Sequence, residues 1–291
     1  MPARKMKIAF QGEIGAYSEE AVAALYPTSA PTPFPSFDAA FEAVANGSVD
    51  RAVLPIENSL FGSVHQNYDL LREHDLQIVA ELQLRIKHQL LARKGSTISE
   101  LTHVFSHPQA LGQCRPFLKS HVPNAKIVSA YDTAGAAKQV SFDQNMGHAA
   151  IASSAAAREY GLEILAHDIE SNHENYTRFL ALTRRNQDPL EGLKSVRGDE
   201  KVRTKTSLLY AQKENVPGGL FKSLAVFALR DIDLIKIESR PLIGSPGKYI
   251  FYLDLLGHQE DERVKNALHH LKEIAASVKV LGSYPSGQFV N

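Results

Sequence analysis

Residues 184–205, RRNQDPLEGLKSVRGDEKVRTK, divide the chain into two parts whose patterns differ. Eleven of these 22 residues are charged, and few of the others are large and apolar. A stretch of this composition has no face to bury in a core, so it is typical of a solvated linker. Pro189, Gly192 and Gly198 disfavour the alternative, a charged surface helix. We therefore take residues 184–204 as a linker between two domains.

The longer part, residues 6–183, alternates short apolar runs with helical patterns. This alternation predicts an α/β fold with βα units on largely parallel sheets. The length suits two α/β lobes that face a cleft, as in periplasmic binding proteins. The predicted strands cover residues 7–10, 51–56, 103–105, 126–130, 148–152 and 176–183, with two more within 76–92. The predicted helices cover residues 18–26, with Ser18 as N-cap, and 37–45, 63–73, 108–119, 133–140 and 154–160.

The shorter part, residues 205–285, has a different order of elements. We predict strands over residues 206–212, 234–238, 249–256 and 278–282, and helices over 217–230 and 260–276. The order βαββαβ within about 80 residues is that of the ferredoxin-like arrangement. This part is therefore expected to be a small separate α/β domain.

Charge and composition limit the class of partner. The chain has 291 residues, with 32 Lys and Arg against 32 Asp and Glu, whereas proteins that bind phosphate backbones carry a basic excess. No apolar stretch approaches the length of a membrane span, and Met1–Arg4 leads into KIAF without a signal segment. The single cysteine, Cys114, suggests a reducing compartment. We expect a soluble cytoplasmic protein that binds neither nucleic acid nor membranes.

Several predicted strands end next to hydroxyl side chains at the start of a helix. Ser59, Ser106, Thr133 and Ser153 occupy such positions, and residues 12–19 (GEIGAYSE) add a turn of the same kind. Free backbone N–H groups at helix starts favour anions, and ligands of α/β folds bind at the carboxyl ends of parallel strands. The pattern predicts a small anionic ligand. The alternative for each residue alone is a helix cap without further function.

Other chemistries lack support in the sequence. The glycine-rich nucleotide motifs and the GxSxG motif of serine hydrolases are missing. His103 and His107 lie across a strand-to-helix junction, which does not suit a metal site. Cys114 follows His107 by seven residues, so a Cys–His dyad is one reading and a small buried residue is the other. We expect no metal and no cofactor, and a site that binds an anion and transfers a proton.

Four motifs, in this order and spacing, resemble the prephenate dehydratase family. They are LPIENSLFGSV (54–64), SHPQALGQC (106–114), YDTAGAAK (131–138) and NYTRF (175–179). The second domain resembles the ACT regulatory domain of that family, through NVPGGLFKSLAVFALRDIDLIKIESRP (215–241) and KVLGSYP (279–285). Plant-type arogenate dehydratases are also similar, notably across FKSLAVFALRDIDL.

The resemblance implies a carbon–oxygen lyase of L-phenylalanine biosynthesis. Prephenate loses CO2 and water to give phenylpyruvate, and no cofactor is required because the product is aromatic. The resemblance makes Thr177 the residue that meets the departing hydroxyl. Because an alcohol is a very weak acid, we expect Thr177 to act as an oriented hydrogen-bond donor or relay.

The resemblance also supplies the other site residues. The implied catalytic residues are Thr177, Glu57, Asn58, Ser106 and Gln113, and the implied substrate-binding residues are Ser59, Gln109, Thr133 and Arg178. Arg178 follows Thr177 on a strand and points to the opposite side if the strand is regular, so a structural ion pair is its alternative. The alternative for Glu57 is a carboxylate in a helix first turn. We expect His107 to hydrogen-bond a helix end rather than the substrate.

For the second domain, the resemblance implies allosteric inhibition by phenylalanine in a homodimer or homotetramer. The implied phenylalanine site consists of Asn215, Pro217, Gly218, Gly219 and Leu220, with Glu238, Ser239, Arg240 and Pro241 facing it across a dimer interface. The alternative is a purely structural dimerisation module. For the whole chain, two other functions stay open: an arogenate dehydratase that gives phenylalanine directly, and a two-lobed ligand-binding protein without catalysis.

Overall fold

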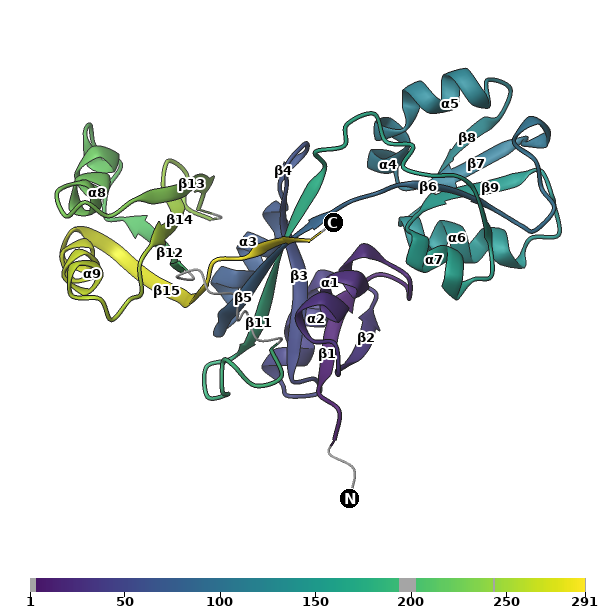
Figure 1. The fold of residues 1–291 in the computed structure, drawn as a ribbon. Coiled ribbons are helices and arrows are strands. Elements are labelled where there is room, and N and C mark those ends of the chain that lie inside the picture. The colour runs from purple at the N-terminus through teal and green to yellow at the C-terminus, as the bar shows by residue number, and fades with distance from the viewer. Residues whose placement is uncertain (1–3, 194–202, 243, 291) are drawn as a thin grey trace.

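Three sheets organise the computed structural model, which describes residues 4–193, 203–242 and 244–290 (Figure 1). One sheet belongs to the first lobe of the longer part, one belongs to its second lobe, and the third belongs to a C-terminal unit. In Figure 1 the C-terminal unit and the second lobe lie at opposite ends of the molecule, with the sheet of the first lobe between them. The predicted leader-free start at residues 1–3 and most of the predicted linker, residues 194–202, lie outside the described residues.

The first lobe is built on a seven-stranded sheet of order β16-β5-β11-β3-β1-β2, with β4 paired to β3. Its strands are β1 (Lys7–Gln11), β2 (Ala30–Phe34), β3 (Arg51–Asn58), β4 (Gly62–Ser63), β5 (Leu76–Arg85), β11 (Tyr176–Arg184) and β16 (Gln288–Val290). Its helices are α1 (Tyr17–Leu25), α2 (Phe37–Ala45) and α3 (His65–Glu73). β1, β2 and β3 are parallel, but β11 runs antiparallel to both β3 and β5. The expected largely parallel sheet is therefore mixed.

The second lobe holds a five-stranded sheet of order β10-β6-β9-β7-β8, also mixed. Its strands are β6 (Gln89–Ala92), β7 (His103–Ser106), β8 (Lys126–Ser129), β9 (His148–Ala152) and β10 (Glu163–Ala166). Its helices are α4 (Pro108–Gln113), α5 (Arg115–His121), α6 (Thr133–Phe142) and α7 (Ser154–Glu159), with a 3-10 turn at Ile98–Glu100. α6 packs closely on β9 because both present buried alanines at the contact, which leave little side chain between the backbones.

Two local predictions were wrong and one strand was missed, each for an identifiable reason. The helix expected over residues 108–119 is two short helices, because Pro116 cannot continue α4 and instead lies in the first turn of α5, which begins at Arg115. The N-cap of α1 is Ala16, whereas Ser18 is buried inside the first turn. The sequence analysis missed the strand β2, which reads APTPF, because prolines are rare in strands. These prolines are tolerated because β2 is an edge strand that pairs only with β1.

The C-terminal unit has the predicted βαββαβ order. It comprises β12 (Thr204–Gln212), α8 (Gly219–Ala228), β13 (Leu234–Pro241), β14 (Tyr249–Leu256), α9 (Glu262–Ile274) and β15 (Ala275–Pro285). The antiparallel sheet has the order β13-β14-β12-β15, and Leu208, Tyr210 and Leu253 on one face share a core with both helices. Leu209 and Tyr252 on the other face join the core of the first lobe.

Two features fasten the C-terminal unit to the first lobe. At Gly282 a Cβ would lie 2.2 Å from the carbonyl oxygen of Ile78, so only glycine permits this approach of β15 to β5. Beyond β15 the chain returns to the first lobe and adds β16 in parallel to the edge of β5. Part of the predicted linker is also docked, because the buried Arg51 donates to the carbonyls of Asp188 and Pro189 at 2.6 and 3.0 Å.

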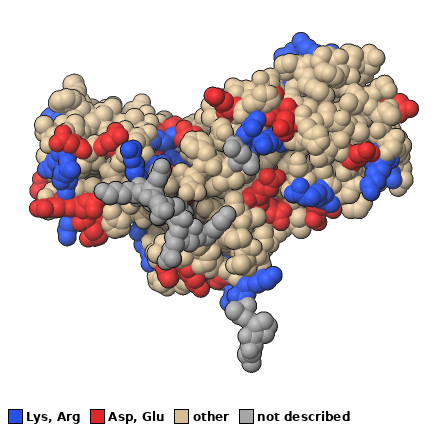
Figure 2. Space-filling model, viewed as in Figure 1, with Lys and Arg blue, Asp and Glu red and all other residues tan. Residues whose placement is uncertain are grey.

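The surface agrees with the predicted balance of charge. On the face shown in Figure 2, Lys and Arg are interspersed with Asp and Glu, and neither sign covers a whole unit. Among the described residues, no helix combines the length and the apolar character needed to cross a membrane. The face in this view shows no broad basic patch of the kind that binds nucleic acid.

Candidate active site

A cavity of about 570 Å³ lies where residues of the two lobes meet. Five helices begin at its wall, namely α1, α2, α3, α4 and α6. The residues at these starts that line the cavity are Ala16, Tyr17, Ser18, Ser36, Phe37, Val64, Gln66, His107, Gln109, Ala110, Asp132 and Thr133. Helix starts present free N–H groups and the positive end of the helix dipole, so the cavity favours an anion. No lysine or arginine is found among the described residues that line the cavity, so the helix starts must supply the attraction for an anion.

Thr177 and Asn58 lie opposite each other on the neighbouring strands β11 and β3, and both line the cavity. The side-chain oxygen of Asn58 accepts the backbone N–H groups of Leu60 and Phe61 at 3.0 and 3.1 Å, which fixes the orientation of the amide. Its Nδ2 then donates to Oγ1 of Thr177 at 3.0 Å. Because Oγ1 is the acceptor and no described residue takes its proton, the Thr177 hydroxyl is left as a donor at the cavity.

The same amide begins a chain of hydrogen bonds that crosses to the second lobe. Nδ2 of Asn58 donates to Oδ1 of Asn175 at 2.8 Å, and Nδ2 of Asn175 donates to Oε1 of Gln113 at 2.9 Å. Oε1 of Gln113 also lies 2.5 Å from Nε2 of His88, so Nε2 must carry the proton. Nδ1 of His88 is then an acceptor, and the Tyr17 hydroxyl lies 2.9 Å from it.

The groups at the end of this chain are uncharged near neutral pH. Burial lowers the pKa of His88, against the weaker opposing effects of Gln113 and Glu170. Burial and the nearby carboxylates, Glu20 first among them, raise the pKa of Tyr17 well above its ordinary value. The chain therefore orients neutral donors and acceptors, and it places Gln113 at the cavity without adding a net charge.

Arg178 lies on the opposite face of β11 from Thr177, as strand alternation requires. It is 6% exposed, and its guanidinium contacts Glu81 at 2.7 Å and Asp254 at 2.6 Å. It also donates to the hydroxyl of Tyr284 at 3.1 Å. Arg178 does not line the cavity, so its place matches the structural ion pair that the sequence left as the alternative to substrate binding.

Glu57 and Ser59 also lie outside the cavity. Alternation along β3 turns Glu57 away from Asn58, and its carboxylate pairs with Lys236 of the C-terminal unit at 3.0 Å. The Ser59 hydroxyl donates to the carbonyl of Glu174 at 2.9 Å and accepts the N–H of Tyr176 at 3.0 Å. We expected Glu57 as a catalytic residue and Ser59 as a substrate-binding residue, but these contacts do not place either side chain in the cavity.

The remaining predicted residues divide between cavity and core. Gln109 and Thr133 line the cavity, whereas Ser106 is fully buried and donates to the carbonyl of Ile151 at 2.6 Å. His107 accepts the N–H of Gln109 at 3.3 Å and so caps α4 as predicted, although it also borders the cavity. Cys114 is fully buried, and burial raises the pKa of its thiol, which disfavours a thiolate nucleophile.

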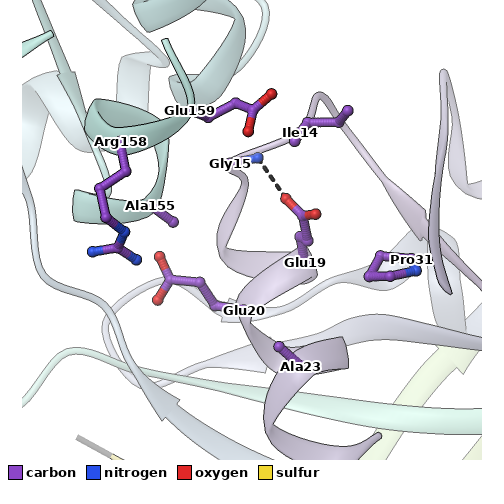
Figure 3. A pocket seen from close by; sticks show the side chains of 9 residues that line it. All are labelled: Ile14, Gly15, Glu19, Glu20, Ala23, Pro31, Ala155, Arg158 and Glu159. Atoms are coloured by element: carbon purple, nitrogen blue, oxygen red, sulfur yellow. Dashed lines mark hydrogen bonds between the residues drawn. The ribbon is translucent and has the colours of Figure 1, made fainter. Parts of the chain in front are cut away.

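A second hollow, of about 390 Å³, lies between α1 and α7 (Figure 3). Its charged lining residues are Glu19, Glu20, Glu159 and Arg158. The Glu19 carboxylate turns back to accept the N–H of Gly15 at 2.6 Å. Three carboxylates against one guanidinium repel an anion, and none of the predicted site residues lies here. Of these two hollows, the one that contains Thr177 is therefore the better candidate for the substrate site.

The residues predicted to bind phenylalanine occupy two places in the C-terminal unit. Residues 215–220 form the turn into α8, where Gly218 has φ 77°, a conformation that favours glycine. The second set ends β13, where Glu238 accepts the Ser63 hydroxyl at 2.8 Å and Arg240 pairs with Asp69 at 2.9 Å. Within this single chain, both side chains face the first lobe.

The sequence-based prediction missed three residues that line the cavity, Tyr17, His88 and Asp132, and the buried Asn175, which is hydrogen-bonded to two lining residues. Asn175 and Asp132 stand inside the motifs NYTRF and YDTAGAAK, so the motifs held a signal that the residue types alone did not. Tyr17 lies in the GEIGAYSE turn, and His88 belongs to no motif. His88 lies between β5 and β6, where the chain passes from the first lobe to the second. Its contact with Gln113 joins residues 25 positions apart in the sequence. Over the described ranges, no group of three or more His, Cys, Asp or Glu side chains is arranged to hold a metal ion.

Comparison with known proteins gives consistent results over nearly the whole chain. A sequence profile of the prephenate dehydratase family matches residues 8–187. Arogenate dehydratase 2 of Petunia hybrida is 49% identical over 296 residues, which cover 97% of this chain and 72% of the relative. A relative from Arabidopsis thaliana, named arogenate dehydratase/prephenate dehydratase 2, chloroplastic, is 48% identical, with 97% and 73% covered.

Solved structures share the fold as well. A prephenate dehydratase from Arthrobacter aurescens, solved in complex with L-Phe, has a TM-score of 0.85 at 32% identity, with 97% of this chain and 90% of that chain covered. A structure described as GqqA, a novel type of quorum quenching acylases, has a TM-score of 0.85 at 34% identity, with 96% and 98% covered. Both alignments include the C-terminal unit, because they span almost all of this chain.

Proposed function

This chain belongs to the prephenate dehydratase family, and from that premise we propose that its cavity converts prephenate to phenylpyruvate, or arogenate to phenylalanine, by decarboxylating dehydration. The observation that carries the proposal is the Thr177 hydroxyl, held by Asn58 so that its proton faces a cavity surrounded by helix starts. Both substrates are dicarboxylates that carry a ring hydroxyl. Helix starts suit their carboxylates, and a fixed donor suits the hydroxyl that leaves.

The two candidate reactions make and break the same bonds. The bond between the ring and its carboxylate breaks, and its electron pair moves into the ring. The bond between the ring and the hydroxyl oxygen breaks at the other side, so the carboxylate leaves as CO2 and the ring becomes aromatic. The departing hydroxide takes a proton that comes from solvent and leaves as water. Negative charge therefore develops on one oxygen, and stabilising that oxygen lowers the barrier.

Thr177 is the group proposed to meet that oxygen. An alcohol is too weak an acid to give up its proton outright near neutral pH, so Thr177 acts as a hydrogen-bond donor to the developing hydroxide. The bond that Oγ1 accepts from Asn58 strengthens this donor, because hydrogen bonds in a chain polarise one another. Asn175, Gln113 and His88 hold Asn58 in that orientation and are positioning residues.

Replacing Thr177 by valine tests this role, because valine keeps the shape and removes the donor. We expect kcat to fall about 10²- to 10³-fold with KM within a few fold of the wild-type value. Thr177→Ser is the matched control, because it keeps the hydroxyl and is expected to keep most of the activity. Valine activity within about fivefold of wild type would contradict the role, and a wild-type chain that binds but turns over neither substrate would favour the non-catalytic binding protein.

We propose that the C-terminal unit is an ACT domain that binds phenylalanine and inhibits the enzyme. The prephenate dehydratase from Arthrobacter aurescens was solved with L-Phe bound, which supports this proposal. The proposed site uses Asn215 and residues 217–220 at the start of α8, with residues 238–241 contributed by a second chain. Phenylalanine at millimolar concentration is expected to bind and to lower activity. If it does neither, the regulatory proposal fails and a structural dimerisation module stands instead.

The free edge of the C-terminal sheet supports a dimer. β13 is an edge strand, and Ile235 and Ile237 on it are 42% and 47% exposed. An exposed apolar edge is a ready pairing surface for another strand. We propose that β13 pairs with β13 of a second copy in a homodimer, from which a homotetramer can form. Sedimentation of the wild-type chain is expected to show at least a dimer, and Ile237→Asp is expected to shift it toward monomer.

Contacts between β13 and the first lobe supply a route for inhibition. Lys236 pairs with Glu57, next to Asn58, at 3.0 Å, and Glu238 binds the hydroxyl of Ser63, which lines the cavity. A change at β13 on phenylalanine binding therefore acts on residues beside the catalytic pair. Coupling of this kind is a free energy between two sites.

We propose that the protein works in a reducing compartment, either the cytoplasm or the chloroplast. The Arabidopsis relative is named chloroplastic, whereas the sequence led us to expect the cytoplasm. The single buried cysteine agrees with any reducing compartment. Fractionation of cells that produce the native chain, with immunodetection in each fraction, decides between the two.

A further inference from the structure

The cavity contains one carboxylate, Asp132, in a place where the proposed function leads us to expect none. Of the described residues that line the cavity, Asp132 is the one acidic side chain, and no lysine or arginine accompanies it. Prephenate brings two carboxylates and no positive group. With Asp132 ionised, prephenate therefore adds a dianion to a cavity that already holds a negative charge, and like charges in a partly desolvated site repel strongly.

The position of Asp132 places it at the meeting point of the lobes. Its Oδ1 accepts the N–H of Gly135 and so caps α6. A Cβ built on Gly12, in the turn after β1, would lie 3.6 Å from the other oxygen, Oδ2. Oδ2 therefore lies against the turn after β1 in the first lobe, while α6 belongs to the second lobe. Burial raises the pKa of Asp132, against the weaker opposing effects of the backbone N–H groups of Gly135 and Glu13 and of His107. A cation placed beside the carboxylate would favour its charged form.

Capping alone does not explain a charged residue here. Ser36 caps α2 at the same cavity by accepting the N–H of Ala39 at 3.2 Å, and Ser153 caps α7 by accepting the N–H of Ala156 at 2.9 Å. Neutral caps thus serve neighbouring helices of the same fold, and serine or asparagine caps about as well as aspartate. The charge of Asp132 is an additional feature that calls for a positive partner.

We propose that Asp132 binds the α-ammonium group of arogenate and makes the cavity selective for this amino-acid substrate over the keto acid prephenate. The inference rests on the proposed function and names its substrate. Arogenate differs from prephenate by an ammonium group in place of the keto oxygen, so it carries a permanent positive group. The basic cavity residue that acts on Asp132 is His107, whose pKa is lowered by burial, so it is a weak counter-charge near neutral pH. An ammonium donates charge-assisted hydrogen bonds to a carboxylate, whereas a keto oxygen offers only lone pairs to it.

The test is steady-state kinetics of the full chain with both substrates, for the wild type, Asp132→Asn and Asp132→Ser. Both replacements keep a good helix cap and remove the charge. The matched control is Asp143→Asn, which removes a carboxylate beyond the other end of α6, where it pairs with His148 and lies away from the cavity. The readout is the ratio of kcat/KM for arogenate to kcat/KM for prephenate.

The wild-type chain is expected to prefer arogenate, and both Asp132 variants are expected to lower the ratio about 10- to 100-fold, the range for one hydrogen bond to a charged group. Their kcat/KM for prephenate is expected to hold or rise, and Asp143→Asn is expected to leave the ratio unchanged. A wild-type preference for prephenate, or an equal fall for both substrates, overturns the inference while the proposed function stands. Turnover of neither substrate by the wild type defeats the proposed function itself.

Discussion

The substitution Arg178→Met removes a cation that two buried carboxylates share. Glu81 and Asp254 are 5% and 7% exposed, and their oxygens lie 2.7 and 2.6 Å from the guanidinium. Glu81 keeps a second cation, because Lys205 lies 2.7 Å from its other oxygen. Asp254 is left with the hydroxyl of Ser207. The substitution therefore leaves one buried carboxylate at the contact between the first lobe and the C-terminal unit without a counter-charge.

Breaking a buried ion pair on one side costs about 3–5 kcal/mol of folding free energy. For a chain of this size we expect the midpoint of thermal unfolding, followed by circular dichroism, to fall by about 6–20 °C. The double variant Arg178→Met with Asp254→Asn is the control, because the amide needs no cation. It is expected to be more stable than the sum of the two single effects, as partners in one network are not additive.

Kinetics of the same variant distinguish a structural from a substrate-binding role. Arg178 lies outside the cavity, so the folded variant is expected to keep the wild-type KM for either substrate within a few fold. The reasoning would be refuted by the opposite pattern, an unchanged unfolding midpoint with KM raised about tenfold or more. That result would mean that the guanidinium reaches the substrate.

Three further predictions follow from single contacts. Burial depresses the pKa of His88 below its ordinary value of 6.5, so its contribution to stability is complete above about pH 6.5 and is lost as the pH falls from there toward the folded-state pKa. His88→Gln is therefore expected to flatten the fall of the unfolding midpoint between about pH 7 and 5 relative to wild type, and identical slopes would contradict this. Glu57→Gln removes the ion pair with Lys236 outside the cavity, so it is expected to leave kcat within about twofold but to weaken inhibition by phenylalanine. A large fall in kcat would instead support a catalytic role for Glu57. Gly282→Ala is expected to cost about 3 kcal/mol in urea unfolding, since its Cβ would lie 2.2 Å from the Ile78 carbonyl oxygen, and a neutral effect would show that β15 can move away from β5.

Patterns local in sequence predicted most of the elements. Phe37–Ala45, His148–Ala152 and Tyr249–Leu256 have the predicted bounds, because periodicity and flanking turn residues suffice to define them. The mixed character of the sheets was not predictable in this way. The antiparallel insertion of β11 between β3 and β5, and the return of β16 to β5, are pairings between distant segments.

The candidate site likewise combines residues that local sequence patterns predict with residues that only long-range pairing brings together. Thr177 and Asn58 lie together because the motifs that contain them occupy neighbouring strands in register. Glu57 and Arg178 belong to the same motifs but point the other way, and strand alternation alone predicts this for Arg178. His88 joins the site through the crossing between lobes, so neither its spacing nor its neighbours in sequence revealed it.

Turnover of prephenate and of arogenate by the wild-type chain, measured side by side with and without phenylalanine, tests the central claim most directly. We predict release of CO2 from at least one substrate, with phenylpyruvate or phenylalanine as the matching aromatic product, and suppression by millimolar phenylalanine. Binding of both substrates without release of CO2 from either would contradict the assignment of catalysis to the cavity around Thr177.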